Sequence, residues 1–149
     1  MDKPFQRKGA DSNAQVGRDF ENVAQEYFAR QGLNLVPNFM IEIGINGHKP
    51  HNFDLGDFNP KILVECKAHT WTESDKVPSA KMTTWNQAMY FFYAAPPGFR
   101  KILFVLRDFS QKRNETLGQY YIRTNSHLIP LDVEVWEFDE IQRTAERIK

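Results

Sequence analysis

Hydrophobic side chains recur along this chain at two spacings, one typical of helices and the other of strands. Between Ser12 and Gln31 they recur every three or four residues, and Gly32 follows at the position where a helix commonly ends. A second segment, Ser79–Ala94, is rich in apolar residues and is followed by prolines at 96 and 97. Both segments are predicted to be helices.

Five shorter segments have the patterns of strands. Isoleucines at every second position follow Met40, and the pair Asn46-Gly47 is typical of a hairpin turn. The pair Asn59-Pro60 indicates another turn. The segment 101–107 encloses the run Ile-Leu-Phe-Val-Leu, which is typical of a strand covered on both faces. The predicted strands are 40–45, 52–58, 62–67, 101–107 and 133–138.

The remaining segments complete the expected order of elements. Glu115–Thr124 is interpreted as a short helix, Asp139 with Gln142 as a capping box that opens a C-terminal helix, and the polar segment Thr70–Pro78 as an exposed loop. This order predicts an α/β fold, with helices packed against a mixed β-sheet. We expect one domain over residues 12–149, preceded by a flexible N-terminus at residues 1–11.

The composition fits a single globular domain. The 149 residues are 41% apolar, and 12 Phe, 5 Tyr and 3 Trp can fill a substantial core. The one cysteine, Cys66, cannot form an intramolecular disulfide and fits a reducing compartment. No run approaches the roughly 18 apolar residues needed to cross a bilayer, and the polar first ten residues lack the apolar part of a signal peptide. We expect a cytoplasmic protein with no membrane partner.

Charge alone neither supports nor excludes a nucleic-acid partner. Nineteen Lys and Arg balance 19 Asp and Glu, whereas nucleic-acid-binding domains typically carry a basic excess. Basic residues nevertheless cluster locally, near the N-terminus and again at 107, 112 and 113. Bound cations would also offset part of the negative charge of a carboxylate site.

Two acids and a lysine on adjacent predicted strands carry the candidate chemistry. Side chains alternate along a strand, so Glu65 and Lys67 extend the face that begins with Leu63. Asp54 lies on the preceding strand and can come beside Glu65 if the two strands pair through the short turn. Two carboxylates so close repel each other, and a divalent cation removes that repulsion. Hard oxygen ligands favour Mg²⁺ or Mn²⁺ over Zn²⁺.

A simpler interpretation of the same residues remains open. Glu65 and Lys67 can form an ordinary ion pair on the same face of an edge strand, with Asp54 in a turn. The apolar residues that flank all three favour a buried site, because a charge on a buried strand needs a partner or a metal ion.

The spacing of Asp54, ten further residues, and then Glu65-Cys66-Lys67 resembles the signature of the PD-(D/E)XK nuclease superfamily, which has the restriction-endonuclease-like fold. Phe53 stands where that signature has its proline. Glu21 matches a glutamate that the superfamily commonly carries on its first helix, although a helix-surface acid is the alternative. The segment Gly17–Leu33 most resembles the first helix of the Holliday-junction-resolvase-like branch. The resemblance covers Gly17 to Arg107 and implies an αβββαβ core.

The resemblance also implies an activity. The chain would be a Mg²⁺-dependent DNA endonuclease, with Mn²⁺ as a substitute and no organic cofactor, that is restriction-like, a repair enzyme or junction-resolving. Asp54, Glu65 and the backbone carbonyl of Cys66 would hold the ion, and Glu21 would reach it through water or help to bind a second ion. Lys67 would orient the attacking water. A homodimer would let one active site serve each strand of a duplex.

Other residues have competing interpretations. Lys81 can reach solvent along the helix surface or contact a phosphate. His48, His51 and Asp54 lack a convincing fourth ligand for zinc, so a zinc site is not expected. A turn residue is the simpler interpretation of His51, and a position near the phosphate is the alternative. Cys66 is interpreted as a small core residue rather than a nucleophile. The apolar second helix is either buried by sheet and tail or part of a dimer contact.

A second hypothesis assumes the same fold without catalytic activity. The neutral net charge and short length are compatible with a non-catalytic nucleic-acid-binding module. The acid–acid–lysine set favours the enzyme, because a binding module has no evident need for buried like charges. A structural protein with Glu65 and Lys67 exposed and far from Asp54 is a third possibility.

Overall fold

A computed structural model describes residues 13–149, so the predicted flexible segment 1–11 lies outside the described residues. A six-stranded sheet in the order β1-β2-β3-β4-β7-β8 forms the centre of the fold, and β5 and β6 form a separate hairpin. In chain order the elements are α1 (Asn13–Arg30), β1 (Val36–Ile43), β2 (Lys49–Phe58), β3 (Lys61–Lys67), α2 (Ser79–Ala94), β4 (Arg100–Leu106), β5 (Phe109–Ser110), β6 (Glu115–Thr116), α3 (Leu117–Asn125), β7 (Val133–Asp139) and β8 (Thr144–Arg147), with single 3-10 turns at Glu73–Asp75 and Ser126–Leu128.

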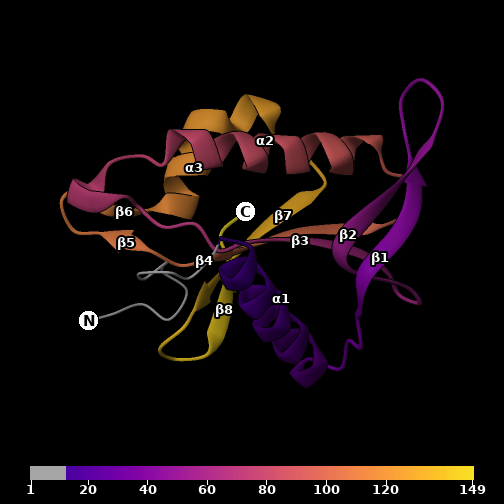
Figure 1. Ribbon diagram of the computed structural model, residues 1–149, viewed down its shortest axis with the longest axis horizontal. Coiled ribbons are helices and arrows are strands. Elements are labelled where there is room, and N and C mark those ends of the chain that lie inside the picture. The colour runs from indigo at the N-terminus through magenta and orange to yellow at the C-terminus, as the bar shows by residue number, and fades with distance from the viewer. Residues whose placement is uncertain (1–12) are drawn as a thin grey trace.

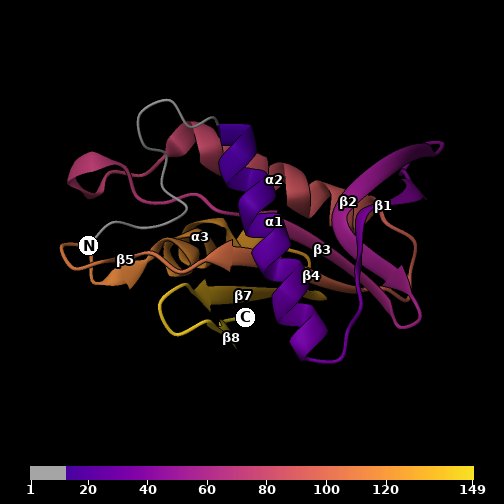
Figure 2. The same cartoon turned by 60° about the horizontal axis from the view of Figure 1, so that its bottom comes forward.

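The sheet is mixed, and helices cover both of its faces. Strands β1, β2 and β3 are antiparallel neighbours, whereas β3, β4 and β7 run parallel and β8 returns antiparallel to β7. Helix α1 crosses one face, and α2 and α3 lie over the other (Figures 1 and 2). The α/β class with a mixed sheet is therefore as predicted from the sequence.

The apolar stripe of α1 packs against the parallel strands. Phe20 and Ala24 are completely buried, and the Phe20 ring stacks on Phe104 of β4 with centroids 5.7 Å apart. We call this layer the α1-side core. It also contains Phe28, Leu35, Leu55, Ile62, Val64, Ile102, Leu106 and Phe138. The helical spacing seen in the sequence therefore faces the sheet, as expected.

The opposite layer, the α2-side core, lies between the sheet and helices α2 and α3. Phe92 of α2 stacks on Phe53 of β2 with centroids 5.7 Å apart, and Trp85 meets Tyr121 of α3 at 5.0 Å. Sheet and tail thus bury α2 together, while Tyr90 and Tyr93 on its outer side stay exposed. Within residues 13–149, no helix has both the length and the hydropathy needed to span a membrane.

The prediction of a C-terminal helix was wrong. The Asp139 carboxylate does accept the backbone N–H groups of Ile141 and Gln142, at 2.9 and 3.0 Å, as a capping residue does. The bonds close a turn instead of opening a helix, since Arg143 has a φ of 59° and reverses the chain. The following residues form β8, which pairs with β7 from Trp136 to Asp139.

Several other elements differ from the prediction in their boundaries or exposure. β1 begins at Val36 and ends at Ile43, so Ile45 lies in the turn and is exposed. The segment 70–78 is not wholly exposed, because Trp71 is buried and its backbone N–H donates to Asp108. The helix expected from Glu115 begins at Leu117, since residues 115–116 pair with β5 and Thr116 caps the helix.

We expect Phe20→Ala to destabilise the fold by about 3–5 kcal/mol, because the change leaves a cavity between α1 and β4. Leu131→Ala is the matched control: the Leu131 side chain is 99% exposed, and its loss should change stability by about 0.5 kcal/mol or less. Urea unfolding followed by tryptophan fluorescence measures both. Equal stability of the two variants would contradict the assigned packing of α1.

Candidate active site

The candidate site forms where β2 and β3 separate. The two strands pair from Phe58↔Lys61 as far as Leu55↔Val64. At the next position, the Asp54 carboxylate oxygen Oδ2 accepts the backbone N–H of Cys66 at 2.7 Å. A side chain therefore takes the place of a main-chain acceptor, and this bond fixes Asp54 against the end of β3.

The regular alternation of β2 breaks at the same residue. Phe53 belongs to the α2-side core and Leu55 to the α1-side core, although residues two apart in a regular strand share a face. Opposite Asp54 on β1, Asn38 has a φ of 50°, a conformation that asparagine tolerates better than most residues. At this distortion the Asp54 side chain lies beside the backbone of Cys66.

Glu65 is a buried carboxylate on an internal strand. Its residue is 6% exposed, and its Oε1 lies 3.1 Å from Nε2 of His51. Burial raises the pKa of Glu65 well above its usual range, and the negative charge of Asp54 and a hydrogen bond with it raise the pKa further. The positive charge of Lys67 opposes this effect.

Glu21 reaches the same place from α1. The pKa of its half-buried carboxyl is raised to about 7, first by burial, then by the charge of Asp54 and a hydrogen bond with it, and then by Glu65. Arg18 acts in the opposite direction. The structure thus brings Glu21, Asp54 and Glu65 together from a helix and two strands, so Glu21 is not an isolated acid of the helix surface.

Two lysines accompany the acids. Lys67 ends β3 and is half-buried, and Lys81 is exposed in the first turn of α2. Burial is the largest cause of a lowered pKa at His69, and the charges of both lysines lower it further, to about 4. His69 Nδ1 accepts the indole N–H of Trp85 at 2.8 Å, which anchors the segment after β3 to α2.

Cys66 behaves as the core residue expected from the sequence. It packs against the α1-side core, and burial, together with Asp54, Glu21 and Glu65, raises the pKa of its thiol well above the usual value. A thiol in this environment stays protonated at neutral pH and is a poor nucleophile.

The sequence-based interpretation of His51 as a turn residue was wrong. His51 lies inside β2, not in a turn, and contacts Glu65. In a regular strand His51 and Asp54 would face opposite sides of the sheet, so no local signal relates the histidine to the acids. His48, the other candidate zinc ligand, is exposed at the β1–β2 turn. Among the residues described, no group of three or more His, Cys, Asp or Glu side chains is arranged so that it could hold a metal ion.

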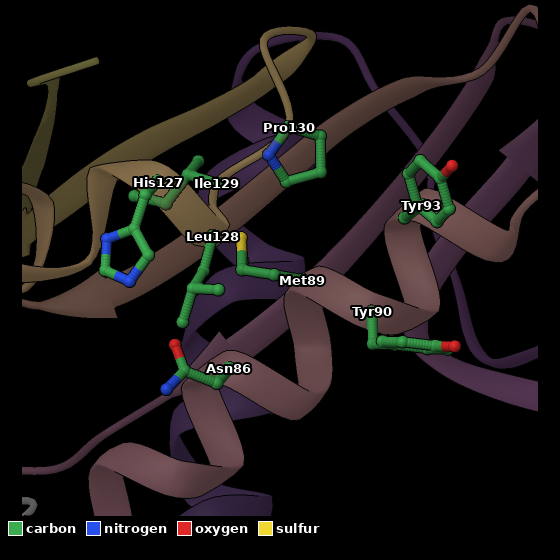
Figure 3. A pocket seen from close by; sticks show the side chains of 8 residues that line it. All are labelled: Asn86, Met89, Tyr90, Tyr93, His127, Leu128, Ile129 and Pro130. Carbon is green, nitrogen blue, oxygen red and sulfur yellow. The ribbon is translucent and has the colours of Figure 1, made fainter.

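A separate pocket lies on the outer side of α2. Its volume is about 470 Å³, and four α2 residues, Asn86, Met89, Tyr90 and Tyr93, line it together with residues 127–130 (Figure 3). None of the predicted site residues lines this pocket. Its lining has no carboxylate or lysine, in contrast to the candidate site where β2 and β3 separate.

Comparison of the chain with protein-family models, with curated proteins and with solved structures gives no match in any of the three. The resemblance of Asp54 and Glu65-Cys66-Lys67 to the nuclease signature therefore stays an expectation.

We expect Glu21→Gln to stabilise the cation-free protein at pH 8 and to have little effect at pH 4. Because the pKa of Glu21 is raised in the folded state, the folded state holds a proton that the unfolded state has released. The contribution of Glu21 to stability therefore falls as the pH rises from the ordinary glutamate pKa towards 7, and glutamine removes this loss. Thermal unfolding in EDTA measures the difference, and an equal shift at both pH values would contradict the assignment.

Proposed function

We propose that this chain is a Mg²⁺-dependent endonuclease that hydrolyses DNA phosphodiester bonds, with Asp54, Glu65 and Lys67 as its catalytic residues and Glu21 as an accessory acid. The observation that carries the proposal is the convergence of the three carboxyls of Glu21, Asp54 and Glu65, with the charge of Lys67 acting on Glu65. The lone cysteine favours a reducing compartment, and we place the activity in the cytoplasm.

The electrostatics of the site support a cation ligand. Bringing like charges together in a buried place is unfavourable, and the raised pKa values of Glu21 and Glu65 express this cost. A site with only a structural role gains nothing from such crowding. A divalent cation offsets the repulsion and favours the ionised forms of Glu21 and Glu65.

The residues present fit Mg²⁺ or Mn²⁺ by the chemistry of their donor atoms. Asp54, Glu65 and the carbonyl of Cys66 offer hard oxygens, which both ions prefer. This set contains only two side chains, so it does not require the group of three that the described residues lack. Glu21 would contact the ion through water or help to bind a second ion.

The chain's own residues would divide the work of hydrolysis. The bound ion would supply positive charge at the scissile phosphate and favour ionisation of the attacking water. The ammonium of Lys67 would orient that water and stabilise charge on the phosphate oxygens. Attack in line with the leaving oxygen yields a 3′-hydroxyl and a 5′-phosphate. Lys81, near His69, is proposed to contact a neighbouring phosphate.

A homodimer belongs to the same proposal, since two-fold symmetry would present one active site to each strand of a duplex. Light scattering during gel filtration measures the mass in solution. Restriction-like, repair and junction-resolving activities differ in the DNA geometry they accept, so a panel of duplex, single-stranded and four-way-junction DNA separates them.

Mn²⁺ should raise the unfolding temperature of the wild type, because a ligand that binds only the folded state stabilises it by about 2.7 kcal/mol at 100 times its dissociation constant. Asp54→Asn and Glu65→Gln should lose this shift. Glu42→Gln, at an exposed acid on β1, is the control and should retain it. Differential scanning fluorimetry against Mn²⁺ concentration makes the comparison, and a shift that survives in both site variants would contradict the ligand assignment.

Cleavage should require Mg²⁺ or Mn²⁺, stop in EDTA, and fall by about 10²–10³-fold or more in Lys67→Met and Glu65→Gln. Lys49→Met replaces an exposed lysine on β2 and should cleave as the wild type does. Rates on the DNA panel and circular dichroism of each variant provide the test. Persistent cleavage by both site variants would refute the active site. A folded wild type that binds DNA but cleaves none of it would favour a non-catalytic binding module.

A further inference from the structure

The imidazole of His51 is held in one orientation by aromatic rings. It stacks on Phe91 of α2 with centroids 3.9 Å apart and planes 30° from parallel. The imidazole also meets the Phe53 ring edge-on, with centroids 4.6 Å apart and an interplanar angle of 87°. These two contacts direct Nε2 towards Glu65 Oε1, 3.1 Å away. A histidine that served only to fill space would need no such direction.

The contact with Glu65 has a defined polarity once that carboxyl is ionised. A carboxylate only accepts hydrogen bonds, so Nε2 of His51 must carry the proton and donate it. Oε1 of Glu65 then accepts the hydrogen bond from His51, which leaves Oε2 of Glu65 as the oxygen that can bind a cation. Carboxylates that bind metals are commonly held by such outer hydrogen bonds, which fix the ligand before the ion arrives.

We propose that His51 is a positioning residue for the metal centre: Nε2–H fixes the Glu65 carboxylate in its ligating orientation, and Phe91 fixes the imidazole. The inference rests on the proposed function, since it concerns the same site. It adds to the acid–acid–lysine set a residue that would act through Glu65.

The direct test is Mn²⁺ affinity, measured by electron paramagnetic resonance of free Mn²⁺ on the full chain. His51→Ala should weaken binding by about 10–100-fold. His51→Gln should recover part of the loss, because its amide can donate a hydrogen bond from a similar position. His48→Gln, at an exposed histidine in the β1–β2 turn, should bind Mn²⁺ as the wild type does.

A second measurement uses the wild type and does not depend on how a variant folds. In the Mg²⁺-loaded protein, the ¹⁵N shifts of the His51 ring should identify Nε2 as the protonated nitrogen. Protonation on Nδ1 alone would overturn the proposal, because Nε2 could then not donate to Glu65.

The outcomes separate the two levels of inference. If the wild type binds Mn²⁺ and His51→Ala, folded by circular dichroism, binds it equally well, the role of His51 is refuted while the proposed nuclease stands. If the wild type binds no Mn²⁺, the metal centre itself is refuted and the positioning role with it.

Discussion

The hydrogen bond from the Cys66 backbone N–H to the Asp54 carboxylate determines the geometry of the whole candidate site. It forms where the pairing of β2 with β3 ends. The Asp54 side chain there accepts the backbone N–H that a carbonyl of a neighbouring strand would otherwise accept. Asp54 is thereby held next to Glu65, and the negative charge of each carboxylate repels that of the other. The raised pKa values of Glu21 and Glu65 follow from this placement and from burial.

The layers around the sheet make this crowding tolerable. β3, β4 and β7 are internal strands covered by α1 on one side and by α2 and α3 on the other (Figure 1). Large completely buried side chains such as Phe20, Trp85 and Phe104 supply stabilisation that does not depend on the site. An unfavourable cluster of acids can therefore persist at one edge of an otherwise well-packed fold.

Helix α1 and helix α2 each serve packing and site together. Phe20 is buried under the sheet while its neighbour Glu21 joins the acids. From the other side, α2 supplies Phe91 against His51 and Trp85 against His69, so both histidines near the site are oriented by this helix. A shift of α1 would move Glu21, and a shift of α2 would move the rings that contact His51 and His69. Either shift would therefore change the geometry of the proposed site.

The sequence by itself determined most elements, because periodicity is local: the spacing of Phe20, Ala24 and Phe28 and the apolar run after Lys101 correctly predict α1 and β4. It also singled out Asp54, Glu65 and Lys67. Asp139 was misinterpreted, since an aspartate that caps a helix and one that closes a turn have the same local pattern. Only the tertiary structure decided that Glu21 and His51 meet these acids. Their approach depends on the break in β2 and on the packing of two helices, which join residues distant in the chain and leave no periodic signal along it.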